Sequence, residues 1–188
     1  MNKKKLRPWK TLSRKTILNH SKFLKVESHE VQLPDGEIIP DWGWVIIHDA
    51  ALILAQREDG KFLVFRQRKY AIEGTSLAPV GGMLETDEEP LEAAKRELRE
   101  EMGYESSNWI NLGSYLVDPN CNVATMHLFL ALDAKYTTPP DSDDLEEQEL
   151  LLFSKEELEE ALNAGEFKVI NWALLISLAL RHLSEHLK

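Results

Sequence analysis

Hydrophobic and polar residues alternate with a period of two along the first part of the chain, as they do in strands. A Pro-Asp-Gly turn at residues 34–36 and a Glu-Asp-Gly turn at residues 58–60 separate the alternating segments. The predicted strands are residues 23–33, 37–44, 45–55 and 61–67. Because short turns join antiparallel neighbours, we expect a β-meander that begins with a hairpin.

The second part of the chain predicts helices as well as strands. The clearest helix covers residues 89–102, with Pro90 in its first turn and Gly103 in the stop position. Residues 73–83 contain four Gly or Pro residues and are expected to form an irregular loop. Further strands are predicted at residues 109–117, 125–133 and 150–153, and further helices at residues 154–163 and 171–187. Because no regular βα alternation appears, the predicted fold class is α+β with a mixed-sheet sandwich.

The composition is that of a folded protein with one main domain. The chain has 188 residues, of which 43% are hydrophobic, so it can bury a proper core. Its longest uncharged apolar stretch, residues 170–180, is far shorter than the roughly 20 residues of a membrane-spanning helix. A single cysteine, Cys121, forms no internal disulfide, and no secretory signal pattern opens the chain. These features predict a cytoplasmic protein without a membrane partner.

Charge is distributed unevenly along the chain. The net charge is −10, yet residues 1–26 hold nine Lys or Arg and no acid. Residues 27–188, with 13 basic and 32 acidic residues, carry −19, so no nucleic acid is expected as a partner of this body. The basic arm has three interpretations: contact with a nucleic acid, a transit peptide, or docking on the acidic surface of its own chain or of a partner subunit. Docking is the preferred one.

Three carboxylates share one face of the helix predicted at residues 89–102. At about 100° per residue, Glu97, Glu100 and Glu101 fall within an arc of about 100°, apart from the apolar stripe that faces the core. Like charges at this spacing destabilise a helix unless something neutralises them. Two interpretations are open: a solvated acidic face balanced by neighbouring Lys and Arg, or a site for a hard cation such as Mg²⁺.

The spacing around this helix resembles the signature of the Nudix hydrolases. Gly82 is followed after five residues by Glu88, and after seven more by Arg-Glu-Leu-Arg-Glu-Glu-Met-Gly-Tyr at residues 96–104. This run agrees with G-x5-E-x7-R-E-U-x-E-E-x-G-U, where U is apolar or aromatic, at every fixed position. The resemblance implies an α/β/α sandwich with a mixed sheet. It also implies that the chain hydrolyses a nucleoside diphosphate linked to another moiety, with Mg²⁺ or Mn²⁺.

The resemblance implies roles for the residues of this segment. The expected metal ligands are the backbone carbonyl of Gly81 and the carboxylates of Glu97, Glu100 and Glu101. Arg96 lies four residues from both Glu92 and Glu100 and is expected to hold carboxylates in place through charge-assisted hydrogen bonds. Glu88 is expected to lie off the metal face and to tether the preceding loop to the helix.

A general base is also needed for hydrolysis. In similar family members it is a Glu on a late acidic loop, and the candidates here are Glu146, Glu147 and Glu149. Counting back from Ser154 favours Glu146, with Glu147 second. The alternative is that these are solvated loop carboxylates.

Beyond the signature, residues 8–180 resemble the ADP-ribose and ADP-sugar pyrophosphatases. The Asp-Trp pair at residues 41–42, after the Pro-Asp-Gly turn, is similar to the extra N-terminal sheet of that subfamily, and residues 79–82 are similar to its glycine loop. The chain departs from the subfamily pattern at Lys69, where Arg is usual, and at residues 120–121, where a companion glycine is missing.

This second resemblance implies hydrolysis of ADP-ribose to AMP and ribose 5-phosphate by a homodimer with exchanged N-terminal sheets. Residues 1–44 would serve assembly and base binding, and residues 45–188 would form the hydrolase domain. The implied substrate-binding residues are Phe23, Trp42, Arg66 and Pro119. Each of these residues also has a structural interpretation. Phe23 and Trp42 would then be ordinary core residues, Arg66 a buried structural cation, and Pro119 part of an ordinary turn.

Other functions stay open at this point. The substrate is alternatively another nucleotide, such as GDP-mannose or a noncanonical nucleoside triphosphate. From a different class comes a Nudix-fold module that binds a nucleotide without turning it over. The intact Arg96, Glu97, Glu100 and Glu101 argue against that module.

Overall fold

The structure, a computed structural model, describes residues 6–21, 23–141 and 147–186. The chain divides into two compact units. The first consists of residues 1–48 and 116–125, and the second of residues 49–115 and 126–188. Each unit has its own sheet, and each is described by itself below.

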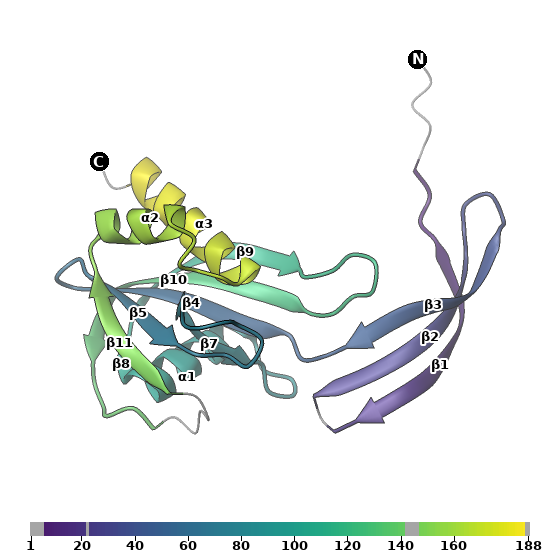
Figure 1. Cartoon of the computed structure of the whole chain (residues 1–188), viewed down its shortest axis with the longest axis horizontal. Helices are drawn as coiled ribbons and strands as arrows, with labels where there is room; N and C mark the ends of the chain where they lie inside the picture. Colours follow the sequence, from purple (N-terminus) through teal and green to yellow (C-terminus); the bar gives the residue numbers. More distant parts are fainter. Residues whose placement is uncertain (1–5, 22, 142–146, 187–188) are drawn as a thin grey trace, which may run out of the picture. The chain divides into compact units, whose positions relative to one another are not determined.

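The first unit is built on a three-stranded antiparallel sheet of order β1-β2-β3 (Figure 1). Its strands are β1 (Lys10–His20), β2 (Leu24–Gln32) and β3 (Ile38–Ile46). The predicted hairpin is confirmed, since β2 and β3 pair across a turn in which Gly36 adopts a positive φ of 101°. The backbone N–H of Gly36 donates to the carbonyl oxygen of Leu33 (3.0 Å), which closes this turn.

Strand β1 corrects the description of residues 1–26 as a basic arm. Residues 10–20 pair with β2 along its length, with β-bulges between Thr11 and Ser13 and between Thr16 and Leu18. Every residue of β1 is exposed, so no buried position marks this strand in the sequence. The strand is held by backbone hydrogen bonds to β2, and positive charges on an exposed edge strand are compatible with such pairing.

A second correction concerns the strand predicted at residues 45–55. The structure ends β3 at Ile46 and begins the next strand at Ala50, with residues 47–49 between them. The backbone N–H groups of Val45 and Ile47 donate to the carbonyl oxygens of Cys121 (2.9 Å) and Val123 (3.3 Å). These bonds attach residues 116–125 to the first unit.

The second unit contains an eight-stranded mixed sheet. Its central path has the order β11-β5-β4-β10-β8, with β6 on β5, β7 on β4 and β9 on β10. Strand β10 runs parallel to β4, and the other pairs with a recorded register are antiparallel. The strands are β4 (Ala50–Arg57), β5 (Phe62–Gln67), β6 (Ser76–Ala78), β7 (Val80–Met83), β8 (Tyr104–Glu105), β9 (Asn108–Leu116), β10 (Thr125–Tyr136) and β11 (Gln148–Phe153).

Residues 73–83 are not the irregular loop that their Gly and Pro content predicted. They contain β6, which pairs with β5, and β7, which pairs with β4. In β7 the positions of Gly81 and Gly82 lie opposite Leu52 and Ala51. The reason for the error is that a neighbouring strand supplies hydrogen bonds that local propensity does not reveal.

Helices cover both faces of this sheet (Figure 1). Helix α1 (Pro90–Met102) packs on one face, where Ala51, Ile53 and Ala55 of β4 point. Helices α2 (Lys155–Asn163) and α3 (Ile170–His186) pack on the other, toward Leu52 and Leu54. Strand β4 is buried on both sides, and its alternate residues therefore point into two separate cores. The predicted α+β fold with an α/β/α sandwich and an additional N-terminal sheet is confirmed.

The helix ends follow their local signals. Helix α1 begins at Pro90 and is terminated after Met102 by Gly103. This glycine has a φ of 74° and donates its N–H to the carbonyl oxygen of Arg99 (2.9 Å). Helix α2 begins with a capping box formed by Ser154 and Glu157. Among the described residues, no helix is both long enough and apolar enough to span a membrane.

Candidate active site

Arg96 lies at the centre of a charged network on α1. Its Nε and Nη2 donate to Oε1 and Oε2 of Glu88, each at 2.9 Å, in a two-pronged contact. Oε2 of Glu88 also accepts from the backbone N–H of Glu85 (2.9 Å). Glu88 therefore connects the preceding loop to the helix, as predicted.

The same guanidinium reaches two of the predicted metal ligands. Nη1 of Arg96 donates to Oε1 of Glu97 at 2.7 Å and to Oε2 of Glu100 at 3.2 Å. Nη2 also donates to the carbonyl oxygen of Met83 at 3.1 Å, which ties the helix to the end of β7. The expected contact with Glu92 is wrong, because Glu92 pairs with Lys95 (2.7 Å).

These contacts fix the charge states of the central pair. Hydrogen bonds from Arg96 hold the pKa of the Glu88 carboxyl below its ordinary value of 4.5, against the opposing effect of burial. The Glu88 carboxylate in turn raises the pKa of the Arg96 guanidinium, with Glu97 and Glu100 adding to the effect. Both groups therefore remain charged at neutral pH, and the network is a permanent ion-pair cluster.

Two glycines bring backbone close to this network. A Cβ atom at Gly82 would stand 2.3 Å from Oε1 of Glu97, so a larger residue there would displace that carboxylate. At Gly81, with a φ of 153°, a Cβ atom would stand 2.2 Å from the carbonyl oxygen of Ala51. Glu97 is 8% exposed and lies where these two backbone segments meet α1. Gly82 therefore leaves the space that the Glu97 carboxylate occupies, and Gly81 allows β7 to approach β4 closely.

The donor set of this site suits a hard cation. Carboxylate and backbone carbonyl oxygens are the ligands that Mg²⁺ prefers, and it commonly binds to only one or two protein carboxylates plus water and substrate phosphates. Within the described part of the chain, no three His, Cys, Asp or Glu side chains converge as a metal cluster. Glu97, Glu100 and Glu101 still fit such an ion in chemistry, because a site completed by substrate needs fewer than three converging carboxylates.

The late acidic loop starts next to this helix. The backbone N–H of Asp141 donates to the carbonyl oxygen of Glu100 (2.8 Å), and that of Thr137 donates to the carbonyl oxygen of Gly103 (2.8 Å). Glu147 is exposed and immediately precedes β11. Glu146, the first candidate for the general base, lies outside the described residues.

Comparison with known proteins places this site in a family. Residues 46–173 match the NUDIX domain, more than half of the chain. The chain belongs to the Nudix family. Residues 9–45 match the nucleoside diphosphate sugar hydrolase N-terminal domain, which covers the three-stranded sheet. The resemblance read from the glycine and glutamate spacing is thereby confirmed, and the chain is a Nudix hydrolase.

Individual relatives agree with this membership. An ADP-ribose pyrophosphatase of Bacillus subtilis (strain 168) is 28% identical over 166 residues, which cover 86% of this chain and 88% of that protein. A CMP-5'-(N-acetyl-N-hydroxy-3-aminopropyl)phosphonate hydrolase of Streptomyces rubellomurinus (strain ATCC 31215) is 28% identical over 149 residues, 79% of this chain and 71% of that protein. The crystal structure of an ADP compounds hydrolase superposes with a TM-score of 0.82 at 19% identity, covering 97% of this chain and 98% of that one. The last match shows that the two proteins share a fold.

Arg66 lies on the face of this Nudix sheet that is remote from α1. In β5, Phe62 and Val64 point into the core beneath α2 and α3, so alternation places Arg66 on that face as well. Its Nη1 donates to Oε2 of Glu149 (3.0 Å), the β11 residue that lies opposite Arg66 in the sheet. The alternative that Arg66 is a buried structural cation is wrong, because 46% of its side chain is exposed. Glu149, the third candidate base, shares this remote face.

The other predicted binding residues of the Nudix hydrolase lie in the first unit. Trp42 of β3 donates its indole N–H to the carbonyl oxygen of Asn120 (2.7 Å), one residue beyond the exposed Pro119. Phe23, in the turn between β1 and β2, is 51% exposed. The structure therefore brings Trp42 and the Pro119 turn together within one unit.

Sequence reasoning missed an aromatic partner and a buried polar pair in this unit. Trp9 packs edge-on against Trp42, with ring centroids 5.0 Å apart. In β2, Nε2 of His29 lies 2.9 Å from Oε2 of Glu27, both residues are buried, and the imidazole stacks on Trp44. Hydrogen bonds from Lys25 and then His29 hold the pKa of Glu27 below its ordinary value. The sequence did hold a signal for this pair: Glu27 and His29 alternate in step with Val31, so all three side chains are expected on one face of β2.

Proposed function

We propose that this Nudix hydrolase cleaves the diphosphate bond of a nucleoside diphosphate sugar, with ADP-ribose as the preferred substrate and AMP and ribose 5-phosphate as products. The observation that carries the proposal is the Arg96 network, which holds Glu97 and Glu100 and sets the Glu97 carboxylate beside Gly82. The N-terminal domain match and the ADP-ribose pyrophosphatase relative support the substrate class.

Mg²⁺ or Mn²⁺ is proposed as the cofactor, held by the carboxylates of Glu97, Glu100 and Glu101 and by the backbone carbonyl of Gly81. When bound, such an ion lowers the pKa of water and neutralises charge on phosphate oxygens. Arg96 contributes by orienting the carboxylates. Because its guanidinium is itself fixed by Glu88, the positions of Glu97 and Glu100 are set before substrate arrives, which lowers the cost of organising the site.

The general base is proposed to come from the late acidic loop, with Glu146 first and Glu147 second. The support is that this loop begins at a hydrogen bond from Asp141 to the backbone of Glu100, so the loop departs from the carboxylate-bearing end of α1. A base on this loop would remove a proton from the attacking water. Glu149 is a weaker candidate because it pairs with Arg66 on the remote face of the sheet.

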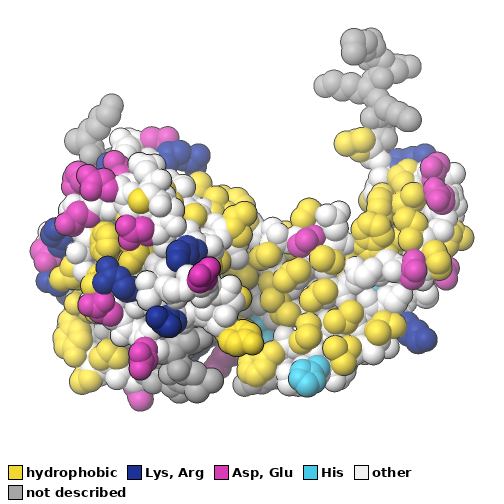
Figure 2. All heavy atoms as spheres, in the orientation of Figure 1, with side chains coloured by type: hydrophobic (Ala, Val, Ile, Leu, Met, Phe, Trp, Pro, Cys, Tyr) yellow, Lys and Arg dark blue, Asp and Glu magenta, His cyan; other side chains and the backbone are white. Residues whose placement is uncertain are grey.

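Residues 1–44 are proposed to bind the base and to form a homodimer in which N-terminal sheets are exchanged, with residues 45–188 as the hydrolase domain. Figure 2 shows hydrophobic side chains gathered over the N-terminal sheet. Such an exposed apolar surface is typical of a protein interface. Trp42, Phe23 and Pro119 are proposed to contact the nucleotide base and its sugar, and Arg66 a phosphate. The exposed large hydrophobic residues of this sheet are Leu12, Ile17, Leu18 and Ile38.

One experiment tests the reaction and its base together. We would measure monophosphate release from ADP-ribose, ADP-glucose, GDP-mannose and a noncanonical nucleoside triphosphate, with Mg²⁺ and then with EDTA. We expect the highest kcat/KM for ADP-ribose, no turnover in EDTA, and a loss in kcat of about 10²–10⁴-fold for Glu146→Gln. Glu159→Gln on the exposed side of α2 is the matched control.

Several outcomes would contradict parts of this proposal. Undiminished turnover in EDTA would remove the metal. A preference for GDP-mannose or for a triphosphate would replace the substrate. If Glu147→Gln alone reduces kcat, the base is Glu147, and if neither variant matters, the base lies elsewhere. Nucleotide binding without any turnover would identify a binding module.

A further inference from the structure

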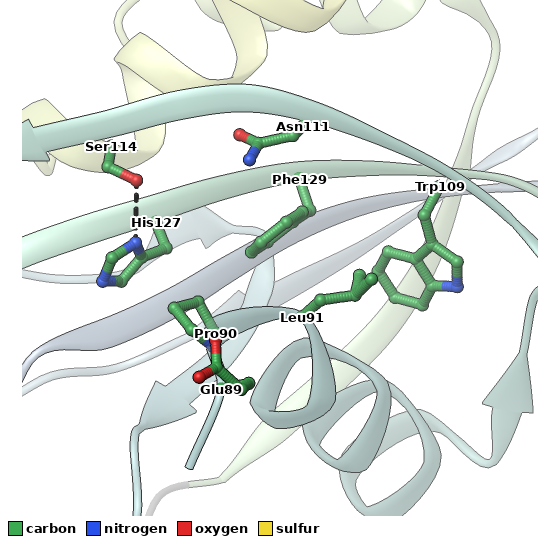
Figure 3. A pocket seen from close by; sticks show the side chains of 8 residues that line it. All are labelled: Glu89, Pro90, Leu91, Trp109, Asn111, Ser114, His127 and Phe129. Atoms are coloured by element: carbon green, nitrogen blue, oxygen red, sulfur yellow. Dashed lines mark hydrogen bonds between the residues drawn. The ribbon is translucent and has the colours of Figure 1, made fainter. Parts of the chain in front are cut away.

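A hollow lies on the α1 face of the second unit. It has a volume of about 390 Å³ and is formed by the start of α1 and by strands β9 and β10 (Figure 3). None of the proposed metal ligands lines it, and neither does Arg96. Its volume is within the range of small-molecule sites. The residues that line it are Glu89, Pro90, Leu91, Trp109, Asn111, Ser114, His127 and Phe129.

The floor of this hollow is aromatic and rigid. Figure 3 shows the ring of Phe129 between the imidazole of His127 and the indole of Trp109, with Leu91 and Pro90 on the helix opposite. Phe129 is 4% exposed, and its ring meets that of Trp109 edge-on with centroids 6.3 Å apart. The indole N–H of Trp109 donates to the carbonyl oxygen of Ser106 (2.8 Å), which fixes the ring. A planar ring fits between such fixed apolar surfaces with little loss of side-chain entropy.

Polar groups stand at defined positions around that floor. The hydroxyl of Ser114 lies 2.8 Å from Nδ1 of His127, so Nε2 is the imidazole nitrogen left to meet a ligand. Oδ1 of Asn111 accepts from the backbone N–H of Gly113 (2.8 Å), so the amide offers its N–H groups. Gly113, with a φ of 116°, shifts the strand so that Ser114 shares the hollow with Asn111 although they are three residues apart.

The charge of the hollow selects among ligands. Among the described residues, Glu89 is the only acidic one that lines it, and no described Lys or Arg does so. The Glu89 side chain makes no capping hydrogen bond to α1, although it occupies the N-cap position. Its carboxylate is an acceptor for a ligand N–H group and repels a ligand carboxylate or phosphate.

From this combination we infer that the hollow beside the start of α1 is a second binding site, for an uncharged planar heteroaromatic compound that carries an amide or amino group. The ring lies against Phe129 and Trp109. The amino or amide N–H groups face Glu89, and ligand acceptors face Asn111 and His127. This site goes beyond the proposed hydrolysis and does not depend on it.

Nicotinamide and nicotinate form a matched pair of probes, since they differ only in an amide against a carboxylate. We would titrate each against the full-length protein by ligand-observed NMR. We expect nicotinamide to bind about tenfold or more tightly than nicotinate, because Glu89 accepts from the amide and repels the carboxylate. Glu89→Gln is expected to reduce this preference to about twofold or less.

A second variant tests the location. Ser114 is exposed, so Ser114→Phe fills the hollow without entering the core, and it is expected to weaken nicotinamide binding about tenfold or more. Ser177→Phe, at an exposed serine of α3, and Glu101→Gln, in the proposed metal site, should leave binding unchanged. Equal binding of the two probes, no binding of nicotinamide at millimolar concentration, or full binding by Ser114→Phe would each overturn the inference.

Discussion

The carboxylate network on α1 and the N-terminal sheet are both rich in charge, but their charged residues are held in opposite ways. On α1 one guanidinium contacts Glu88, Glu97 and Glu100, all within 13 positions along the chain. In β1 every residue is exposed, and the strand is held through its backbone pairing with β2. The network on α1 is organised by side chains, whereas β1 is held by main chain.

The two regions are therefore expected to control different properties of the protein. Side chains that fix one another in a partly buried cluster determine where reactive oxygens lie, so substitutions there should change turnover. An exposed strand held by backbone bonds, such as β1, tolerates side-chain changes without unfolding, so substitutions there should change what the strand contacts.

Glu101→Gln should abolish most turnover and leave the fold intact. The amide keeps the shape of the side chain but removes a charge from the proposed cation site, so we expect kcat to fall by about 10²-fold or more. Glu92→Gln is the matched control, because Glu92 lies on the same helix but pairs with Lys95. Rates and thermal melting curves of both variants check this, and a fully active Glu101→Gln protein would refute the metal assignment.

Gly82→Ala should reduce kcat by about 10- to 100-fold. The added Cβ would lie 2.3 Å from Oε1 of Glu97, so that carboxylate must move from its contact with Arg96. Gly43→Ala in β3 is the control, because no atom lies within 4 Å of its added Cβ. Steady-state kinetics distinguish the two, and equal activity would show that the position of Glu97 does not limit turnover.

Ile17→Glu should weaken self-association and raise KM, by about tenfold, while kcat per active dimer changes by less than about twofold. Ile17 is 60% exposed on β1, within the surface proposed to pair with a second chain. Ile170→Glu, at a 78% exposed position of α3, is the control. Sedimentation of the wild type as a monomer at micromolar concentration with full activity would contradict the proposed exchange of sheets.

Glu88→Gln should cost about 1 kcal/mol of unfolding free energy at neutral pH and less at acid pH. The folded-state pKa of Glu88 lies below its ordinary value of 4.5, so the ion pair stabilises the protein fully above pH 4.5. That stabilisation is lost as the pH falls through the lower folded-state value. Chemical unfolding of both proteins at pH 7 and at acid pH measures the difference, and a difference independent of pH would contradict the role of the ion pair.

Much of α1 was predictable because its interactions are local. Pro90 and Gly103 mark its ends, and the spacing of Arg96, Glu97 and Glu100 places them within one turn of each other. The same holds for the capping box that begins α2. The family resemblance extended this local knowledge to an α/β/α sandwich, which the structure and the NUDIX domain match confirm.

Where the prediction failed, the missing information was the neighbouring strand with which a segment pairs. Strand β1 has no buried face, and residues 73–83, which contain β6 and β7, hold four Gly or Pro residues, so each strand is defined by the strand with which it pairs.

Sequence alone was enough to place the helix that carries the carboxylates, because helical contacts connect residues three or four apart. The spacing of its charged residues also identified the family. Only the tertiary structure decided the pairing of β1, the face on which Arg66 lies, and the aromatic hollow beside Glu89. That hollow joins residues 89–91 to residues 109–114 and 127–129. Its walls meet only when two strands pack against a helix, and no periodic pattern in the sequence predicts that contact.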